Sequence, residues 1–155
     1  MKTVLISIIL GSRSDLPYWE KTLSLLEECR VDYELKILSA HRDSELLEKY
    51  VKSLPRRGIK VVIASAGGAA ALPGVVAAQT FLPVIGVPIP TKVFKGVDSL
   101  LSILQMPKGV PVATMAVGGA GPLNAAIFAM RIISLAKKNY QEKTNHFLKL
   151  LKTKN

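Results

Sequence analysis

Cysteine and histidine are scarce in this sequence. Its 155 residues include one cysteine, Cys29, and two histidines, His41 and His146. A single cysteine excludes an internal disulfide, and one cysteine with two distant histidines does not have the spacing of metal ligands. The side chain of histidine titrates near neutrality. Because His146 lies in a lysine-rich tail, His41 is the one candidate proton carrier in the body of the chain.

Long apolar runs and targeting signals are missing as well. Prolines, glycines and charged residues interrupt every hydrophobic segment before it reaches the length of a membrane span. Residues 1–3 lead directly into a strand-like stretch and contain no signal-peptide cleavage site. We therefore expect a cytoplasmic, metal-free protein that has no membrane partner.

The length of the chain suits one domain and hardly two, so residues 1–155 are predicted to form a single domain. Hydrophobic residues make up 49% of the sequence, and the mean hydropathy is +0.31. This is more apolar surface than a monomer of this size usually hides, and it indicates buried contacts between subunits.

Positive charge is in excess and gathers at the C-terminus. The net charge is +10, and residues 137–155 contain six lysines against one acid, Glu142. A basic tail can bind nucleic acid, but no basic strand interleaved with aromatics and no known nucleic-acid-binding module accompanies this one. We interpret residues from about 140 to 155 as a basic helix with a solvated face, and we predict no nucleic-acid partner.

Strand-like and helix-like segments alternate along the chain. The predicted strands are residues 4–10, 33–38, 60–64, 83–88 and 110–117. The predicted helices are residues 16–29, 43–54, 98–105, 123–138 and 140–151. The first strand is apolar almost throughout, which is typical of a strand buried on both faces. The alternation predicts an α/β fold with a doubly wound parallel sheet.

A short loop follows the first strand, with the sequence Gly11-Ser12-Arg13-Ser14-Asp15. Free backbone N–H groups and hydroxyls beside the positive end of a helix suit a phosphate or another anion. The loop matches neither of the glycine-rich signatures for nucleoside triphosphates and dinucleotides. Asp15 fits either a helix N-cap or a ligand contact, and Pro17 fits the first helical turn.

Two further strand ends carry unusual residues. Ser39-Ala40-His41-Arg42 follows the second strand and places a hydroxyl, a proton carrier and a fixed cation where α/β sheets bind ligands. The alternative is a loop histidine beside a surface arginine. Residues 65–74 follow the third strand and are small or kinked. They can let backbone approach a ligand closely, or they can serve tight packing between helix and sheet.

Five stretches, in this order, resemble the PurE family. They are Gly11-Ser12-x-Ser14-Asp15, Ser39-Ala40-His41-Arg42, the glycine–alanine loop 66–74, Pro83-x-Ile85-Gly86-Val87-Pro88 and Asp98-Ser99-Leu100-Leu101-Ser102-Ile103-x-Gln105-Met106-Pro107. The resemblance extends over about residues 4–136. Members of this family are mutases of purine synthesis that convert N5-carboxyaminoimidazole ribonucleotide to 4-carboxy-5-aminoimidazole ribonucleotide.

The resemblance implies a flavodoxin-like three-layer fold, a homo-octamer whose sites lie where subunits meet, and His41 as the catalytic residue. It also implies a set of residues that bind the ribonucleotide substrate, namely Ser12, Ser14, Asp15, Ser39, Arg42, Gly67, Gly68 and Ala70. The residue types suit these roles, since the guanidinium of Arg42 can hold a phosphate by a fork of charge-assisted bonds. No metal, ATP or organic cofactor is required.

Two positions depart from the family pattern. Ala71 stands where members typically carry a second histidine, and Gly119 stands where asparagine or lysine is usual. Three alternatives to a mutase follow from the sequence. One is a carboxylase that uses free CO2 and aminoimidazole ribonucleotide, although Arg42 and the loop 67–70 favour the mutase type. The others are a non-catalytic nucleotide-binding paralogue, suggested by Ala71, and a nucleic-acid-binding protein, suggested by the basic tail.

Overall fold

The sheet of this protein is five-stranded and entirely parallel in a computed structural model that describes residues 4–153. The expectations for residues 1–3 and for the last two residues of the tail lie outside that range. The strands are β1 (Ile6–Leu10), β2 (Tyr33–Ile37), β3 (Val61–Gly67), β4 (Val84–Ile89) and β5 (Ala113–Thr114). Their spatial order, β2-β1-β3-β4-β5, is that of flavodoxin-like sheets and confirms the predicted doubly wound α/β fold.

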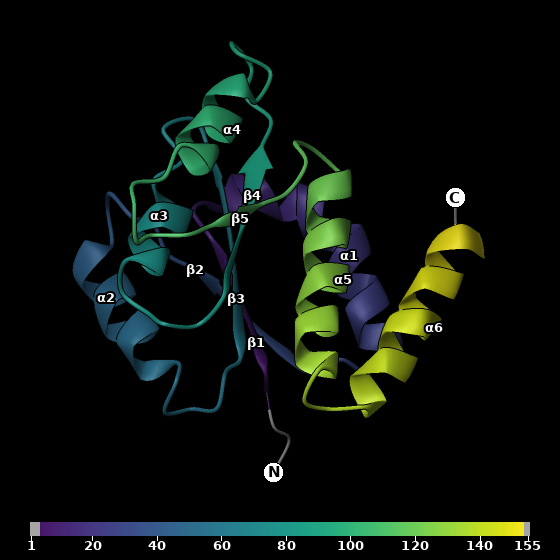
Figure 1. Ribbon diagram of the computed structural model, residues 1–155. Coiled ribbons are helices and arrows are strands. Elements are labelled where there is room, and N and C mark those ends of the chain that lie inside the picture. The colour runs from purple at the N-terminus through teal and green to yellow at the C-terminus, as the bar shows by residue number, and fades with distance from the viewer. Residues whose placement is uncertain (1–3, 154–155) are drawn as a thin grey trace.

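Helices cover both faces of the sheet, which gives three layers (Figure 1). One face is covered by α1 (Leu16–Glu28) and α5 (Ala120–Ser134), with α6 (Asn139–Thr153) packed against both of them. The other face is covered by α2 (Ser44–Ser53), α3 (Leu72–Ala77) and α4 (Val97–Leu104). A short 3-10 helix, η1 (Arg13–Asp15), links β1 to α1.

Every residue of β1 is buried, because this strand lies between β2 and β3 and has helices on both faces. Its polar residue, Ser7, is fully buried and shares a hydrogen bond of 2.7 Å with the hydroxyl of Tyr50 in α2. The Tyr50 hydroxyl donates in turn to the carboxylate of Glu34 in β2. Burial, with Glu34 beside it, raises the pKa of Tyr50. This network ties α2 to the two strands at the sheet edge.

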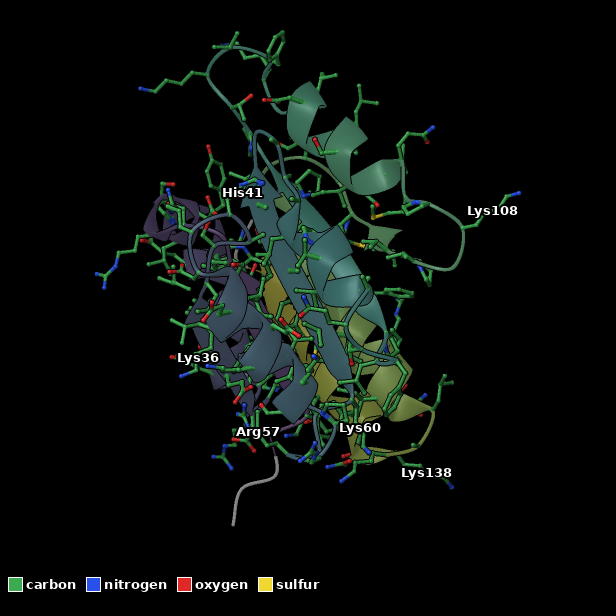
Figure 2. All side chains as sticks on the ribbon, turned by 90° about the vertical axis from the view of Figure 1, so that its left-hand side faces the viewer. Lys36, His41, Arg57, Lys60, Lys108 and Lys138 are labelled. Carbon is green, nitrogen blue, oxygen red and sulfur yellow. The ribbon has the colours of Figure 1, made fainter. Side chains whose placement is uncertain are left out.

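The C-terminal helix belongs to the core on one side only. Phe147 of α6 is fully buried and Tyr140 is almost so, whereas Lys149 and Lys152 are exposed. The predicted basic helix with a solvated face is therefore present. The labelled basic side chains in Figure 2, from Lys36 to Lys138, lie at separate places around the molecule. Within the described chain, no helix has both the length and the apolarity needed to cross a membrane.

The largest differences between prediction and structure lie in two predicted elements and in one helix that was not predicted. The fifth strand has two residues in place of 110–117, because Pro111 has no N–H to donate and the pairing with β4 is limited to Ala113 and Thr114. Helix α3 was not predicted, because the alanines and Pro73 in residues 65–74 do not show the spacing of apolar and polar residues that is typical of a helix. Helix α5 begins at Ala120 and ends at Ser134, earlier at both ends than the predicted 123–138.

Candidate functional site

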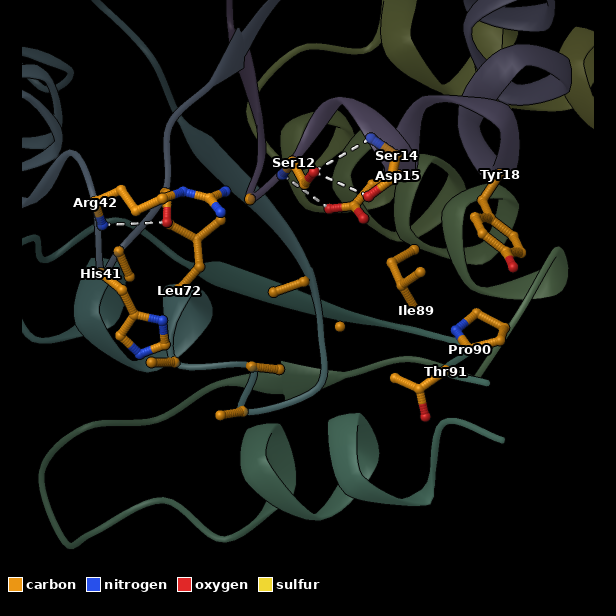
Figure 3. Close-up of a pocket in the computed structure, with 18 of the residues that line it drawn as sticks. Ser12, Ser14, Asp15, Tyr18, His41, Arg42, Leu72, Ile89, Pro90 and Thr91 are labelled. Carbon is orange, nitrogen blue, oxygen red and sulfur yellow. Dashed lines mark hydrogen bonds between the residues drawn. The ribbon is translucent and has the colours of Figure 1, made fainter. Parts of the chain in front are cut away.

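A cavity of about 580 Å³ opens at the carboxyl ends of β1 to β4. Four loops line it, and each follows one of these strands (Figure 3). In a sheet of this order, the chain runs in opposite directions from β1 and β3, and the ends of these two strands leave a crevice where ligands bind. The lining residues from the first three loops are Gly11, Ser12, Ser14, Asp15, Ser39, Ala40, His41, Arg42, Ala66, Gly67, Ala69, Ala70 and Ala71.

The loop after β1 is closed by a reciprocal pair of side-chain bonds. The hydroxyl of Ser12 accepts from the backbone N–H of Ser14 over 3.3 Å, and the carboxylate of Asp15 accepts from the N–H of Ser12 over 3.2 Å. This is a capping box on η1. Asp15 does occupy the N-cap position of α1, but its side chain makes no capping bond to that helix. Of the two roles that the sequence left open for Asp15, the structure does not show the side-chain cap of α1, because the carboxylate turns back to Ser12.

Asp15 as a residue is 5% exposed, and it lies at the wall of the cavity. Burial raises its pKa above the ordinary value, and hydrogen bonds from Ser12, Ser14 and Gly11 oppose that shift. A buried carboxylate that borders a cavity can accept hydrogen bonds from hydroxyl groups of a ligand.

The turn after β2 is held by hydrogen bonds from its backbone N–H groups to side chains of the same turn, and it leaves two other side chains free. The N–H of Ser39 donates to the carboxylate of Asp43 over 2.9 Å, and the N–H of Arg42 donates to the hydroxyl of Ser39 over 3.3 Å. Ser39 is buried, whereas His41 and Arg42 are exposed at the cavity. Among residues 4–153, neither the imidazole of His41 nor the guanidinium of Arg42 has an ion pair or side-chain hydrogen bond. Both are available to a ligand.

The loop after β3 gives the cavity an apolar wall. Gly67, Ala69, Ala70 and Ala71 line it, and Leu72 continues the wall into α3. Gly68 does not line it. This glycine has a φ of +71°, and its N–H donates to the hydroxyl of Ser99 in α4 over 2.9 Å. The structure thus brings seven of the eight predicted substrate-binding residues to the cavity, with His41, and places Gly68 behind the wall.

Sequence reasoning missed the fourth loop and one side chain of α1. Ile89 at the end of β4 and Pro90, Thr91 and Lys92 after it line the cavity, as does Tyr18 (Figure 3). The rule that ligands bind at the carboxyl ends of parallel strands could have identified residues 90–92, since they come directly after a predicted strand. No pattern in the sequence indicated that Tyr18, which lies within a predicted helix, would line the cavity.

The charges at the cavity favour an anion. Arg42 and Lys92 are cationic and Asp15 is the carboxylate among the lining residues. Hydroxyls of Ser12, Ser14, Ser39 and Thr91 lie around them. No group of three or more side chains capable of holding a metal ion occurs in residues 4–153. Fold and cavity together define a doubly wound α/β protein with a site for a small, anionic, hydroxyl-bearing ligand.

Comparison with known proteins places this chain in a family. The family model described as AIR carboxylase matches residues 5–154. A protein of Saccharolobus solfataricus named N5-carboxyaminoimidazole ribonucleotide mutase is 51% identical over 142 residues, which are 92% of this chain and 89% of that protein. A protein of Bacillus subtilis with the same name is 49% identical over 146 residues, covering 91% of this chain and 90% of its own length.

Solved structures agree with the sequence matches. Treponema denticola PurE superposes with a TM-score of 0.80 at 32% identity, covering 97% of this chain and 92% of that one. A variant of Treponema denticola PurE2 superposes with a TM-score of 0.84 at 30% identity, covering 99% of this chain and 94% of that one. The chain belongs to the AIR carboxylase family, and its relatives are PurE proteins, so the predicted resemblance to PurE is confirmed.

Proposed function

We propose that this chain is an N5-carboxyaminoimidazole ribonucleotide mutase, an isomerase of purine biosynthesis. The observation that supports the proposal most strongly is that the loops after β1, β2 and β3 line one cavity. They bring together Asp15, His41 and Arg42 with an alanine-rich wall. The curated relatives that share about half of the sequence bear the name of this enzyme.

In the proposed complex, Arg42 and the hydroxyls of Ser14 and Ser39 hold the phosphate of the substrate. An arginine fork offers two parallel charge-assisted bonds to phosphate oxygens, and the guanidinium of Arg42 has no competing partner within the described chain. The carboxylate of Asp15 accepts from ribose hydroxyls, and its anchor to the N–H of Ser12 fixes its direction. Gly67 and Ala70 let the aminoimidazole ring approach the backbone closely.

The reaction moves a carboxyl group from an exocyclic nitrogen to carbon four of the imidazole. The carbamate N–C bond breaks and yields CO2 and aminoimidazole ribonucleotide, with the nitrogen regaining a proton. The ring carbon then attacks CO2, becomes tetrahedral and loses its hydrogen as a proton, which restores aromaticity. His41 shuttles this proton between carbon and nitrogen, an effect worth about 10²–10⁴-fold in rate.

Between the two steps CO2 has to stay beside the ring. Ala66, Ala70 and Leu72 are buried or nearly so and face the cavity, which makes this part of the wall weakly polar and poor in water. A dry wall limits both the escape of CO2 and its hydration. None of these steps needs a metal, ATP or an organic cofactor.

A carboxylase that acts on free CO2 is the second candidate, and it is favoured by the description of the family model as AIR carboxylase. Incubation with the carbamate nucleotide in bicarbonate-free buffer separates the two candidates. A mutase forms the carbon-carboxylated product at full rate there, whereas a carboxylase forms it from aminoimidazole ribonucleotide and bicarbonate. Nucleotide binding without either product would indicate the non-catalytic paralogue.

We further propose that the functional protein is a homo-oligomer, with an octamer as the expected size, and that residues 1–155 act as one domain in the cytoplasm. Large apolar side chains on α4 and the segment before it are exposed, among them Val93 at 79% and Phe94 at 63%. Phe128 on α5 and Leu135 just after that helix are also exposed. Exposed apolar side chains that gather into a patch usually mark an interface. Light scattering of the purified chain gives the mass that tests this.

A further inference from the structure

Ser99 of α4 links two loops of the cavity from behind. Its side chain is fully buried and is absent from the cavity lining. Its hydroxyl donates to the backbone oxygen of Ile89 at the end of β4 over 2.7 Å. The same hydroxyl accepts from the backbone N–H of Gly68, in the loop after β3, over 2.9 Å. One side chain therefore joins segments that lie 10 and 31 positions away in the sequence.

The two bonds of Ser99 depend on each other. A serine hydroxyl has one hydrogen and two lone pairs. When the Ser99 hydroxyl donates its hydrogen to Ile89, one of its lone pairs points at the N–H of Gly68. The position of the loop after β3 is therefore set relative to the end of β4. Gly68 has a φ of +71°, a conformation that glycine adopts at little cost. This backbone conformation aims its N–H at α4, while its neighbours Gly67 and Ala69 face the cavity.

The neighbouring hydroxyl of Ser102 does not duplicate this contact. It lies 2.7 Å from the backbone oxygen of Asp98 and 3.4 Å from that of Gly68. Because it has a single hydrogen, the shorter bond within α4 takes it. Within residues 4–153, the hydrogen bond of the Gly68 N–H is the one to Ser99.

We propose that Ser99 is a positioning residue that holds the loop 67–71 as the wall against which CO2 is kept during carboxyl transfer. This proposal rests on the mutase activity proposed above. Removing the hydroxyl leaves the half-buried N–H of Gly68 and the buried backbone oxygen of Ile89 without their partner, which is costly unless the loop moves to meet water. A moved loop opens the wall, so captured CO2 escapes and aminoimidazole ribonucleotide is released.

The test compares Ser99→Ala with the native protein in steady-state reactions on the carbamate nucleotide. We expect kcat to fall about tenfold, since small misplacements at an active site can cost up to about 100-fold. KM changes less than kcat does, because Arg42 and Ser39, which hold the phosphate in the proposed complex, lie on another loop. The share of aminoimidazole ribonucleotide among the products rises. Native kcat and native product partition in Ser99→Ala would overturn the proposal.

Two further variants separate positioning from loss of stability. Gly68→Ala alters the same loop at Gly68, the donor of the hydrogen bond to Ser99. An added Cβ there meets no atom within 4 Å, so its effect comes from the positive φ alone, and we expect the same leakage. Ser7→Ala removes another fully buried serine hydroxyl, which bonds to Tyr50 away from the cavity. It should destabilise the fold and leave kcat and partition unchanged. Leakage in Ser7→Ala would overturn the proposal.

Amide hydrogen exchange of the nucleotide-free protein tests, independently of activity, whether Ser99 holds the loop 67–71 in place. In Ser99→Ala the N–H of Gly68 should exchange faster than in the native protein, whereas Ser7→Ala should leave it unchanged. If the native protein showed no turnover while the Gly68 N–H exchanged faster in Ser99→Ala, the mutase function would fail and the role of Ser99 in holding the loop would stand. Unchanged exchange would overturn that role.

Discussion

The indole N–H of Trp19 in α1 donates a hydrogen bond of 3.1 Å to the hydroxyl of Ser65 in β3. Both side chains are fully buried. The backbone oxygen of Ser65 accepts from the N–H of Gly11 over 2.9 Å. A single residue of β3 thus anchors helix α1 and the loop after β1, and both carry residues of the cavity.

Ser65→Ala should lower the free energy of unfolding by about 1–3 kcal/mol, because it leaves the buried indole N–H without an acceptor. Trp19 is the one tryptophan of the sequence, so its fluorescence in a urea titration reports the transition. Ser134→Ala is the control, since the hydroxyl of Ser134 bonds only within its own helix. If Ser65→Ala were as stable as that control, the buried bond would contribute nothing.

His41→Asn should keep nucleotide affinity while the rate of product formation falls by at least about 10²-fold. The reason is that asparagine keeps a polar side chain of similar reach but has no group that titrates. Rapid-quench kinetics gives the rate, and equilibrium binding gives the affinity. Turnover close to native would remove His41 from the mechanism.

Arg42→Ala should weaken nucleotide binding by about 1.5–3 kcal/mol, the range for a hydrogen bond to a charged group. Binding of the nucleoside, which has no phosphate, should hardly change. The matched control is Arg13→Ala, which removes the same charge from an exposed residue that does not line the cavity. Equal losses for nucleotide and nucleoside would assign Arg42 a structural role.

Asp15 predicts a pH dependence of stability. Burial raises its pKa, so the folded state holds the proton more tightly than the unfolded chain does. The contribution of Asp15 to stability is then complete below the unfolded pKa and is lost as the pH rises through the raised folded pKa. Asp15→Asn has no carboxyl group to lose a proton. Its free energy of unfolding, compared with that of the native protein, should therefore increase as the pH rises from about 4 to about 7. Urea titrations at both pH values measure it, and a constant difference would contradict it.

Ala71 lines the cavity at the start of α3, where the family pattern has a histidine. The smaller side chain gives water more room, so the native enzyme should release part of its substrate as aminoimidazole ribonucleotide. Ala71→His should lower that share, as measured by the ratio of decarboxylated to isomerised product. The control Ala69→His places the same ring two residues earlier on the same wall. A native protein without any leakage would show that other residues seal the cavity.

Local patterns predicted the sheet and most of the helices, because the apolar runs of β1 and β3 and the period of α1 are each legible within a dozen residues. Helix α3 and the length of β5 depend on neighbours, since α3 is rich in small residues and β5 extends only where β4 pairs with it. The carboxyl ends of three strands predicted most of the cavity. Tyr18 and Lys92 were missed because their places depend on how α1 and the fourth loop lie around it.

The shortness of β5 bears on how the protein behaves when it is concentrated. A long sheet edge exposes a row of free N–H and C=O groups on which another chain can add a strand. Here the outer edge offers two residues, Ala113 and Thr114, with Pro111 just before them. The opposite edge strand, β2, carries the charges of Glu34 and Lys36. Both edges resist the growth of a continuous sheet between molecules, so copies of this chain can meet through apolar helices without polymerising through their strands.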